Sequence, residues 1–358
     1  MIQNPILNSP FLEPTRHFAF TAEGITDTVL EGRRPSSYFI PTPPPKKSAQ
    51  VTIGEVLQER REEILLVNGL RDRVSAWRQG DYKHVERRTR HLLEHWRREE
   101  REQKLFFCQL EAVETAIYLL EAAGPLKDRF GEEILGRAKA SYNPLLSRIA
   151  FKMATGSGKT VLMAMLIAWQ GLNKLANPED TRFSTNFLVV TPGITIRDRL
   201  RVLLPEDPGN YYQALDLVPA DLREQLGQIR IVVTNYHAFQ LREKLEAPKL
   251  TKEILQKAGV PSPFQETPAE MVRRVCGSLD PRHDVIVFND EAHHCYRGKP
   301  TEEKITGDER KEAETREEEA RIWITGLEHV HRHFGRKDAA RAPEAGKGKQ
   351  RVLYVFDL

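Results

Sequence analysis

The chain has 358 residues, which is room for one large domain or for one domain with an appendage. Charged residues make up 29% of it but the net charge is only +3, which argues against a strongly basic nucleic-acid-binding protein. Its three cysteines are far apart and no apolar run reaches the roughly 18 residues of a membrane-spanning helix, which argues against a disulfide-linked secreted protein and a membrane protein. We therefore expect a cytoplasmic location and no membrane partner.

The N-terminal third differs in composition from the rest. Residues 1–50 are rich in Pro, Ser and Thr, and the prolines from Pro41 to Pro45 are typical of an extended spacer, so we expect a Pro-rich N-terminal arm. Residues 51–104 have apolar residues at helical spacing and many arginines, which predicts a helical, Arg-rich region. The interleaved Trp77, Tyr82 and Trp96 would suit base stacking, but acidic neighbours offset the charge and favour a solvated helix face.

From about residue 147 onward, short apolar runs alternate with helical stretches. The runs are rich in β-branched and aromatic residues and cover 149–153, 187–190, 229–233, 285–288 and 352–356. Such runs are typical of parallel strands buried on both faces, and their alternation with helices predicts an α/β sheet that binds ligands at the C-terminal ends of its strands. We expect one domain over residues 105–358, with insertions at about 241–283 and 297–350.

A Gly-rich loop follows the first of these predicted strands and precedes an apolar helix. Its binding residues are Thr155, Gly156, Ser157, Gly158, Lys159 and Thr160. The glycines permit a backbone that points successive N–H groups into the loop, and together with the helix N-terminus these form an anion site. The sequence predicts that Lys159 contacts the β- and γ-phosphates of a nucleotide and that the Thr160 hydroxyl is a ligand of Mg²⁺.

Two adjacent carboxylates follow the apolar run at 285–289. Asp290 and Glu291 begin the string Asp-Glu-Ala-His at the predicted C-terminal end of a buried strand. Such a pair can divide the chemistry: Asp290 holds Mg²⁺, while Glu291 orients and deprotonates the attacking water. We therefore predict Asp290, Glu291 and Lys159 as catalytic residues, with Thr160 and Asp290 at the metal.

These two motifs resemble those of the DEAD/DEAH-box superfamily 2 helicases. The first position of the general phosphate-loop pattern is Met153 instead of glycine, whereas the helicase version, A-x-x-G-x-G-K-T, is matched at every fixed position. The resemblance implies a RecA-like P-loop domain with a mostly parallel sheet flanked by helices, with ATP and Mg²⁺ as cofactors. Phe107 to Ala112 looks like the family's Q motif, in which Gln109 would hydrogen-bond the adenine edge of ATP.

Two further strand ends fall in the family's order. The run at 187–190 leads into Thr191-Pro192-Gly193, which looks like motif Ia, and the run at 229–233 leads into Thr234-Asn235-Tyr236, which looks like motif Ib. In the family these strand ends contact the nucleic-acid backbone, a role that hydroxyl, amide and backbone N–H groups suit. Ordinary turn chemistry is the alternative.

Within the superfamily, the chain is most similar to the N-terminal portion of the helicase (Res) subunit of type III restriction enzymes. The loop Met-Ala-Thr-Gly-Ser-Gly-Lys-Thr, the string Asn-Asp-Glu-Ala-His-His and residues 31–41 and 105–109 carry this resemblance. It implies a DNA helicase or translocase lobe, with DNA (in duplex form) as partner, together with a methyltransferase or specificity subunit.

No motif of a second RecA-like domain follows the last predicted strand, which ends in Asp357-Leu358. That domain supplies the family's arginine finger, which is worth roughly 10³ to 10⁵ in rate. We therefore expect this chain to bind ATP with little or no hydrolysis of its own, unless a separate chain carries the second domain. Two alternatives remain open: a truncated or split nucleotide- and DNA-binding module without turnover, and an RNA helicase lobe.

Overall fold

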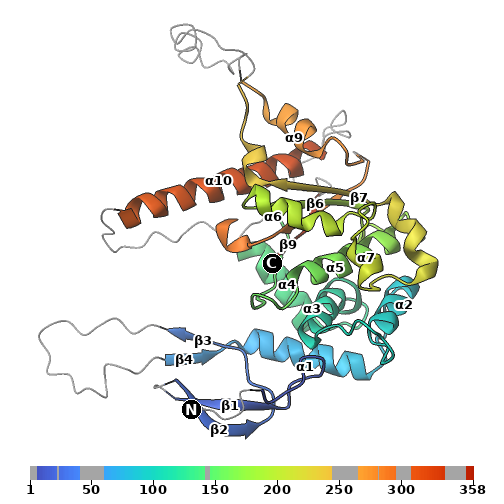
Figure 1. Cartoon of the computed structure of the whole chain (residues 1–358), viewed down its shortest axis with the longest axis vertical. Helices are drawn as coiled ribbons and strands as arrows, with labels where there is room; N and C mark the ends of the chain where they lie inside the picture. The colour runs from blue at the N-terminus through green and yellow to red at the C-terminus, as the bar shows by residue number, and fades with distance from the viewer. Residues whose placement is uncertain are drawn as a thin grey trace, which may run out of the picture. The chain divides into compact units, whose positions relative to one another are not determined.

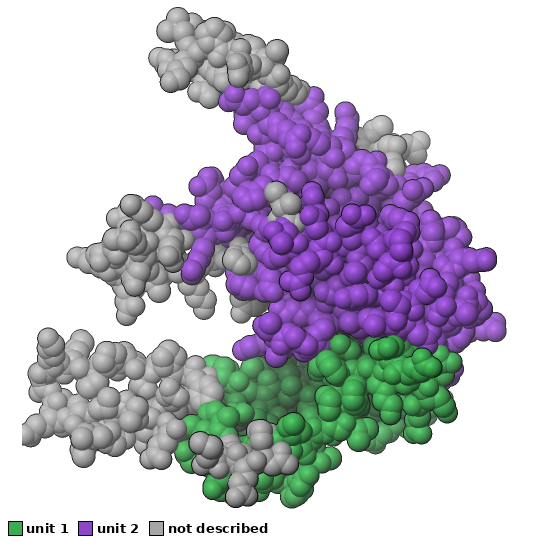
Figure 2. Space-filling model, in the orientation of Figure 1, with its two compact units in different colours: residues 1–85, 96–134 green, residues 86–95, 135–358 purple. Residues whose placement is uncertain are grey.

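The computed structural model of the chain describes residues 6–21, 24–40, 60–141, 146–243, 265–280, 282–295, 308–334 and 352–358. The chain divides into two compact units that interleave in the sequence (Figure 2). Unit 1 comprises residues 1–85 and 96–134, and unit 2 comprises residues 86–95 and 135–358. The predicted boundaries at residues 50 and 104, and those of the two insertions, stay predictions.

Unit 1 contains strands that the sequence did not predict. In the N-terminal region, β1 (Arg16–Thr21) pairs antiparallel with β2 (Gly24–Glu31), and β3 (Ser37–Ile40) pairs antiparallel with β4 (Arg60–Glu63). The β1–β2 register shifts between Phe18 and Phe20, and the Arg34 guanidinium lies 4.4 Å from the centre of the Phe20 ring. The ring of Phe20 therefore takes part in local packing.

The helices of unit 1 enclose a buried carboxylate. They are α1 (Leu65–Gln79), α3 (Phe107–Ile117) and the π-helical turn η1 (Tyr118–Ala122). A further helix, α4 (Arg129–Ser141), begins in unit 1 and continues into unit 2 after residue 134. Glu114 on α3 accepts hydrogen bonds from Arg78, Arg97 and Tyr82, which compensate for its burial. Trp77, Tyr82 and Trp96 are themselves buried, so these aromatic rings pack in the interior instead of presenting a base-stacking surface.

Unit 2 is built on a five-stranded sheet in the order β5-β9-β8-β6-β7, and every pairing is parallel. Figure 1 labels β6, β7 and β9 of this sheet. The strands are β5 (Arg148–Ala150), β6 (Asn186–Thr191), β7 (Arg230–Asn235), β8 (Val285–Asn289) and β9 (Val352–Asp357). All five correspond to the apolar runs in the sequence. The predicted α/β fold with a RecA-like P-loop domain is therefore confirmed.

Two sets of helices cover the two faces of this sheet. On β6, the side chains of Leu188 and Val190 join a core cluster with α9 (Pro268–Cys276) and α10 (Asp308–Phe334). Phe187 points to the other face, where a Cβ placed on Gly171 of α5 (Lys159–Ala176) would lie 3.7 Å from its ring. Almost the whole of α5 from Leu162 to Leu172 is buried, as expected for a helix that is apolar all round.

Shorter helical segments complete unit 2, one of them before β5 and the others after β6, β7 and β8. They are α2 (Arg87–Trp96), α6 (Ile194–Arg199), η2 (Leu200–Leu203), α7 (Tyr211–Ala214), η3 (Ala220–Gln228), η4 (Tyr236–Phe239) and η5 (Ala292–Cys295). The segment η4 directly follows β7, and α6 and η5 begin at the third residue after β6 and β8. Among the helices described, none is both long and apolar enough to cross a membrane.

Candidate nucleotide site

The Gly-rich loop connects β5 to α5 and has the backbone that its glycines predict. Gly156 has φ = 80° and Gly158 has φ = 84°, in the left-handed region that glycine adopts without strain. Gly158 is the N-cap of α5, and its carbonyl accepts from the N–H groups of Val161 and Leu162. The Ser157 hydroxyl donates to the carbonyl of Ala154 at 2.6 Å, which closes the turn.

This loop fits the phosphates of a nucleotide. The N–H groups of the first turn of an α-helix have no intrahelical acceptor, and the helix dipole favours negative charge there. A Cβ placed on Gly156 would meet no other protein atom within 4 Å, so the backbone is open on that side. Lys159, the first residue of α5, and Thr160, the second, are both half-buried and therefore accessible to a ligand.

The acidic motif lies in a turn that three backbone hydrogen bonds hold in place. Asp290 N–H donates to the carbonyl of Val190 at 2.9 Å, Ala292 N–H donates to that of Leu358 at 3.0 Å, and Leu358 N–H donates to that of Asn289 at 2.9 Å. Between them, Glu291 has φ = 51°, which is unusual for a residue with a side chain and costs on the order of 1–3 kcal/mol. The neighbouring strand ends β6 and β9 therefore impose this conformation on the motif.

The fold brings the two motifs together. The amino group of Lys159 lies 3.6 Å from Oε2 of Glu291, and Nδ1 of His293 lies 3.5 Å from the same oxygen. Asp290 is buried, and its burial and the neighbouring charge of Glu291 raise its pKa, whereas the charges of Lys159 and Arg199 oppose that rise. A divalent cation bound here would oppose this rise and favour the charged form of Asp290.

A buried polar network lies directly behind the acidic motif. The side-chain amide of Asn289 donates to Oδ1 of Asp357 at 2.8 Å, and Oδ2 of Asp357 accepts from Arg148 at 2.8 Å. These residues end β8, end β9 and begin β5, respectively. Sequence reasoning assigned none of them a role, because only the strand order shows that they meet.

The two predicted nucleic-acid motifs end adjacent strands, because Thr191 pairs with Asn235 in the ladder between β6 and β7. Thr191 is buried, and its hydroxyl donates to the carbonyl of Gly193 at 2.9 Å. The ring of Tyr236 is also buried. The remaining four residues are half-buried and thus partly accessible: Pro192, Gly193, Thr234 and Asn235.

Gln109 belongs to unit 1, so its predicted contact with adenine stays a prediction. Its side chain is buried, and Oε1 accepts a hydrogen bond at 2.9 Å from the N–H of Phe106 at the start of α3.

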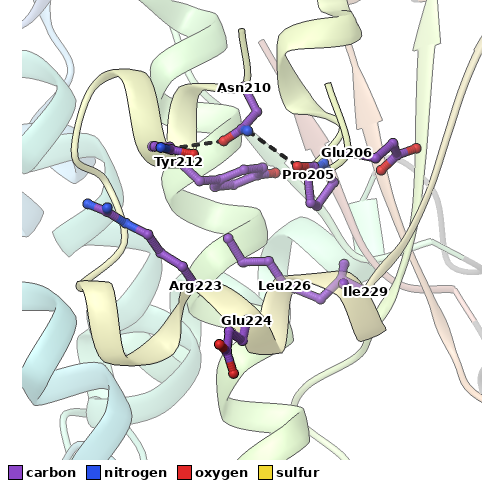
Figure 3. A pocket seen from close by; sticks show the side chains of 10 residues that line it. Pro205, Glu206, Asn210, Tyr212, Arg223, Glu224, Leu226 and Ile229 are labelled. Carbon is purple, nitrogen blue, oxygen red and sulfur yellow. Dashed lines mark hydrogen bonds between the residues drawn. The ribbon is translucent and has the colours of Figure 1, made fainter. Parts of the chain in front are cut away.

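A separate cavity of about 360 Å³ contains none of the predicted site residues (Figure 3). Its lining includes Asn210, Tyr212, Arg223 and Ile229. Ile229 comes just before β7, at the N-terminal edge of the parallel sheet, whereas the phosphate loop comes after β5, at the C-terminal edge. Asn210 donates to the carbonyl of Pro205, and Arg223 pairs with Asp216 at 2.8 Å, so these polar groups are already in use. Within the described residues, no group of three or more His, Cys, Asp or Glu side chains is arranged to hold a metal ion.

The parallel sheet, the loop before α5 and the carboxylates after β8 define the class of a RecA-like P-loop ATP-binding domain. The family model described as "Type III restriction enzyme, res subunit" matches residues 102–325, which is more than half of the chain. The chain therefore belongs to this family, whose helicase-like domains use ATP. The comparisons with curated proteins and with solved structures gave no match.

Proposed function

We propose that this chain is the ATP-binding lobe of a DNA helicase or translocase of the type III restriction kind, in which ATP hydrolysis drives movement along DNA. The observation that carries the proposal is the 3.6 Å approach of Lys159 to Glu291 at the mouth of a loop shaped by Gly156 and Gly158. The residues match the needs of a nucleotide with Mg²⁺, because the loop offers backbone N–H groups and a cation, and the facing turn offers two carboxylates.

Each residue has a distinct role in this proposal. The loop N–H groups and Lys159 bind the phosphates, and Thr160 and Asp290 hold the metal. Glu291 takes the proton from the attacking water, and its partial exposure leaves it accessible to that water. Bound Mg²⁺ would neutralise phosphate charge during the reaction.

The adjacent ends of β6 and β7 support the nucleic-acid part of the proposal. Thr234 and Asn235 are half-buried, and together with Pro192 and Gly193 they offer the hydroxyl, amide and backbone groups that contact phosphates. Such contacts do not distinguish DNA from RNA, so the assignment to DNA rests on the family. A methyltransferase or specificity subunit as partner belongs to the same proposal.

Rapid hydrolysis also needs an arginine that stabilises the transition state, an effect worth roughly 10³ to 10⁵ in rate. We propose that residues 1–358 depend on a second RecA-like lobe for this group. Tested on their own, they should bind MgATP and turn it over slowly.

The experiment is the ATPase rate of the purified chain, alone and with duplex DNA, single-stranded DNA or RNA, beside a titration with MgATP. Binding with slow turnover is the expected result. Stimulation by RNA but not by DNA would favour the RNA helicase alternative. Absence of MgATP binding would contradict the proposed function as a whole.

A further inference from the structure

Helix α10 packs against the elements that follow both functional strand ends. It contacts η4, which follows the Thr234-Asn235 end of β7, and η5, which follows the acidic motif. A Cβ on Gly326 of α10 would lie 2.4 Å from the ring of Phe239 in η4, which is far inside contact distance. The two elements thus approach as closely as a glycine allows.

One side chain of α10, Trp323, contacts residues of both strand ends. Its indole stacks on the ring of Tyr236, with the two planes 6° apart and the ring centres 5.5 Å apart. Its Nε1–H donates a hydrogen bond of 2.9 Å to Oδ1 of Asn289, the residue before Asp290. Trp323 and Asn289 are fully buried, so water cannot replace this bond.

The chemistry of the indole fixes the orientation of Asn289. Because the indole N–H can only donate, it must meet the carbonyl oxygen of the Asn289 amide. The amide nitrogen then faces Asp357, to which it donates at 2.8 Å, and Asp357 is held in turn by Arg148. A shift of Trp323 therefore acts on the last residue of β8 and through it on the turn that carries both catalytic carboxylates.

On the Tyr236 side of Trp323, the packed residues reach the protein surface. His237 is exposed and its ring centre lies 4.0 Å from that of Tyr236, next to the half-buried Asn235. The hydroxyl of Tyr236 is hydrogen-bonded to Glu319, one turn of α10 before Trp323, and burial together with this bond raises the pKa of Tyr236. A ligand at the end of β7 thus meets groups that pack directly on α10.

We propose that Trp323 is a positioning residue that couples the strand end at 234–236 to the acidic motif. Nucleic acid at the first site then changes nucleotide affinity at the second, and the reverse holds by linkage. The inference rests on the proposed function, because it assumes that both ligands bind unit 2.

The test measures this coupling without requiring turnover. The affinity of the 358-residue chain for a short fluorescent duplex DNA is titrated with and without saturating Mg²⁺ and a non-hydrolysable ATP analogue. The wild-type ratio of the two dissociation constants should be at least about fivefold. In Trp323→Phe, which keeps a stacking ring and loses the N–H donor, the ratio should fall close to one while each ligand still binds alone.

Trp169→Phe is the matched control. Trp169 is also fully buried in unit 2, and its Nε1–H donates to the Thr89 hydroxyl at 3.2 Å, so the substitution removes a comparable hydrogen bond away from Asn289. Both variants should lose similar thermal stability, but only Trp323→Phe should lose coupling. If Trp323→Phe does not fold, Tyr236→Leu removes the stack from the other side and should lose coupling too.

If Trp323→Phe retains the wild-type coupling, the inference is overturned while the proposed function stands. The same holds if the wild type binds both ligands but its two dissociation constants for DNA are equal. If the wild type fails to bind the nucleotide analogue, the proposed function falls and the inference falls with it. Equal loss of coupling in Trp169→Phe would show a general effect of stability, which also overturns a specific role for Trp323.

Discussion

The amino group of Lys159 lies 3.6 Å from the carboxylate of Glu291, although the two residues are far apart in the sequence. Lys159 begins α5, and Glu291 is the second residue after β8. The two side chains are 21% and 39% exposed, so solvent screens their attraction and the pair contributes little to stability. Under the proposed function, their proximity therefore matters for ligand binding and catalysis more than for folding.

Glu291→Gln should separate binding from hydrolysis. The amide cannot take a proton from water, so the turnover number should fall by about 10²- to 10⁴-fold, while the affinity for MgATP changes little. Steady-state ATPase rates and a nucleotide titration on the same preparation check this. Unchanged turnover would show that another group is the base.

Glu291→Gly should raise stability while abolishing activity. With φ = 51° imposed on it, residue 291 is strained unless it is glycine. We expect Glu291→Gly to be about 1 kcal/mol more stable than Glu291→Gln, which keeps a Cβ in the same conformation. Urea denaturation midpoints of the two variants measure the difference, and equal midpoints would mean that the turn relaxes freely.

The sequence predicted the parallel sheet because its strands are buried on both faces. Runs such as Phe187–Val190 and Val285–Phe288 contain few polar residues, and that signal needs no knowledge of neighbours. The phosphate loop was equally predictable, since its chemistry depends on local backbone. The antiparallel pairs β1–β2 and β3–β4 escaped prediction because their short strands carry many polar and exposed residues.

The network around Asn289 could not be read from the sequence. Trp323 lies in a strongly charged helix inside a segment that we predicted as an insertion, and nothing local shows that its N–H reaches Asn289. Likewise, the ring of Tyr236 was predicted at a nucleic-acid contact, whereas in the structure it stacks in the interior on Trp323. Contacts of this kind depend on the order of strands in the sheet and on which helix covers which face.

Gly171→Ala should destabilise unit 2. A Cβ at this position on α5 would lie 2.3 Å from Cδ1 of Ile229, so the buried Ile229 side chain or the helix must shift, at a cost of about 1–3 kcal/mol. Gly136→Ala is the matched control, because it is also a helical glycine but has open space around it, and it should gain about 0.5–1 kcal/mol. Thermal unfolding compares them, and similar shifts would refute the packing argument.

Asp128→Asn should make the free energy of unfolding of unit 1 less sensitive to acidic pH. Burial alone would raise the pKa of Asp128, but hydrogen bonds from Tyr118 and Arg73 outweigh it and hold that pKa below its ordinary value. A carboxyl group whose pKa is lowered by folding stabilises the fold at a pH above its ordinary pKa. This stabilisation is lost as the pH falls through the lowered pKa of the folded state. The variant should therefore be about 1 kcal/mol less stable at neutral pH, with the gap closing below about pH 4.

Urea denaturation of the wild type and Asp128→Asn across this pH range tests the sign. A gap that widens in acid would mean that the pKa of Asp128 is raised instead.

The most direct test of the central claim is MgATP binding by the wild type and by Lys159→Ala, with Lys152→Ala as control. Lys152 is an exposed lysine of the same loop, outside the Gly-rich motif. Lys159→Ala should weaken binding by about 10- to 100-fold, because a charge-assisted contact with phosphate is lost, and Lys152→Ala should bind as the wild type does. Equal affinities in all three proteins would contradict the assignment of this loop as the nucleotide site.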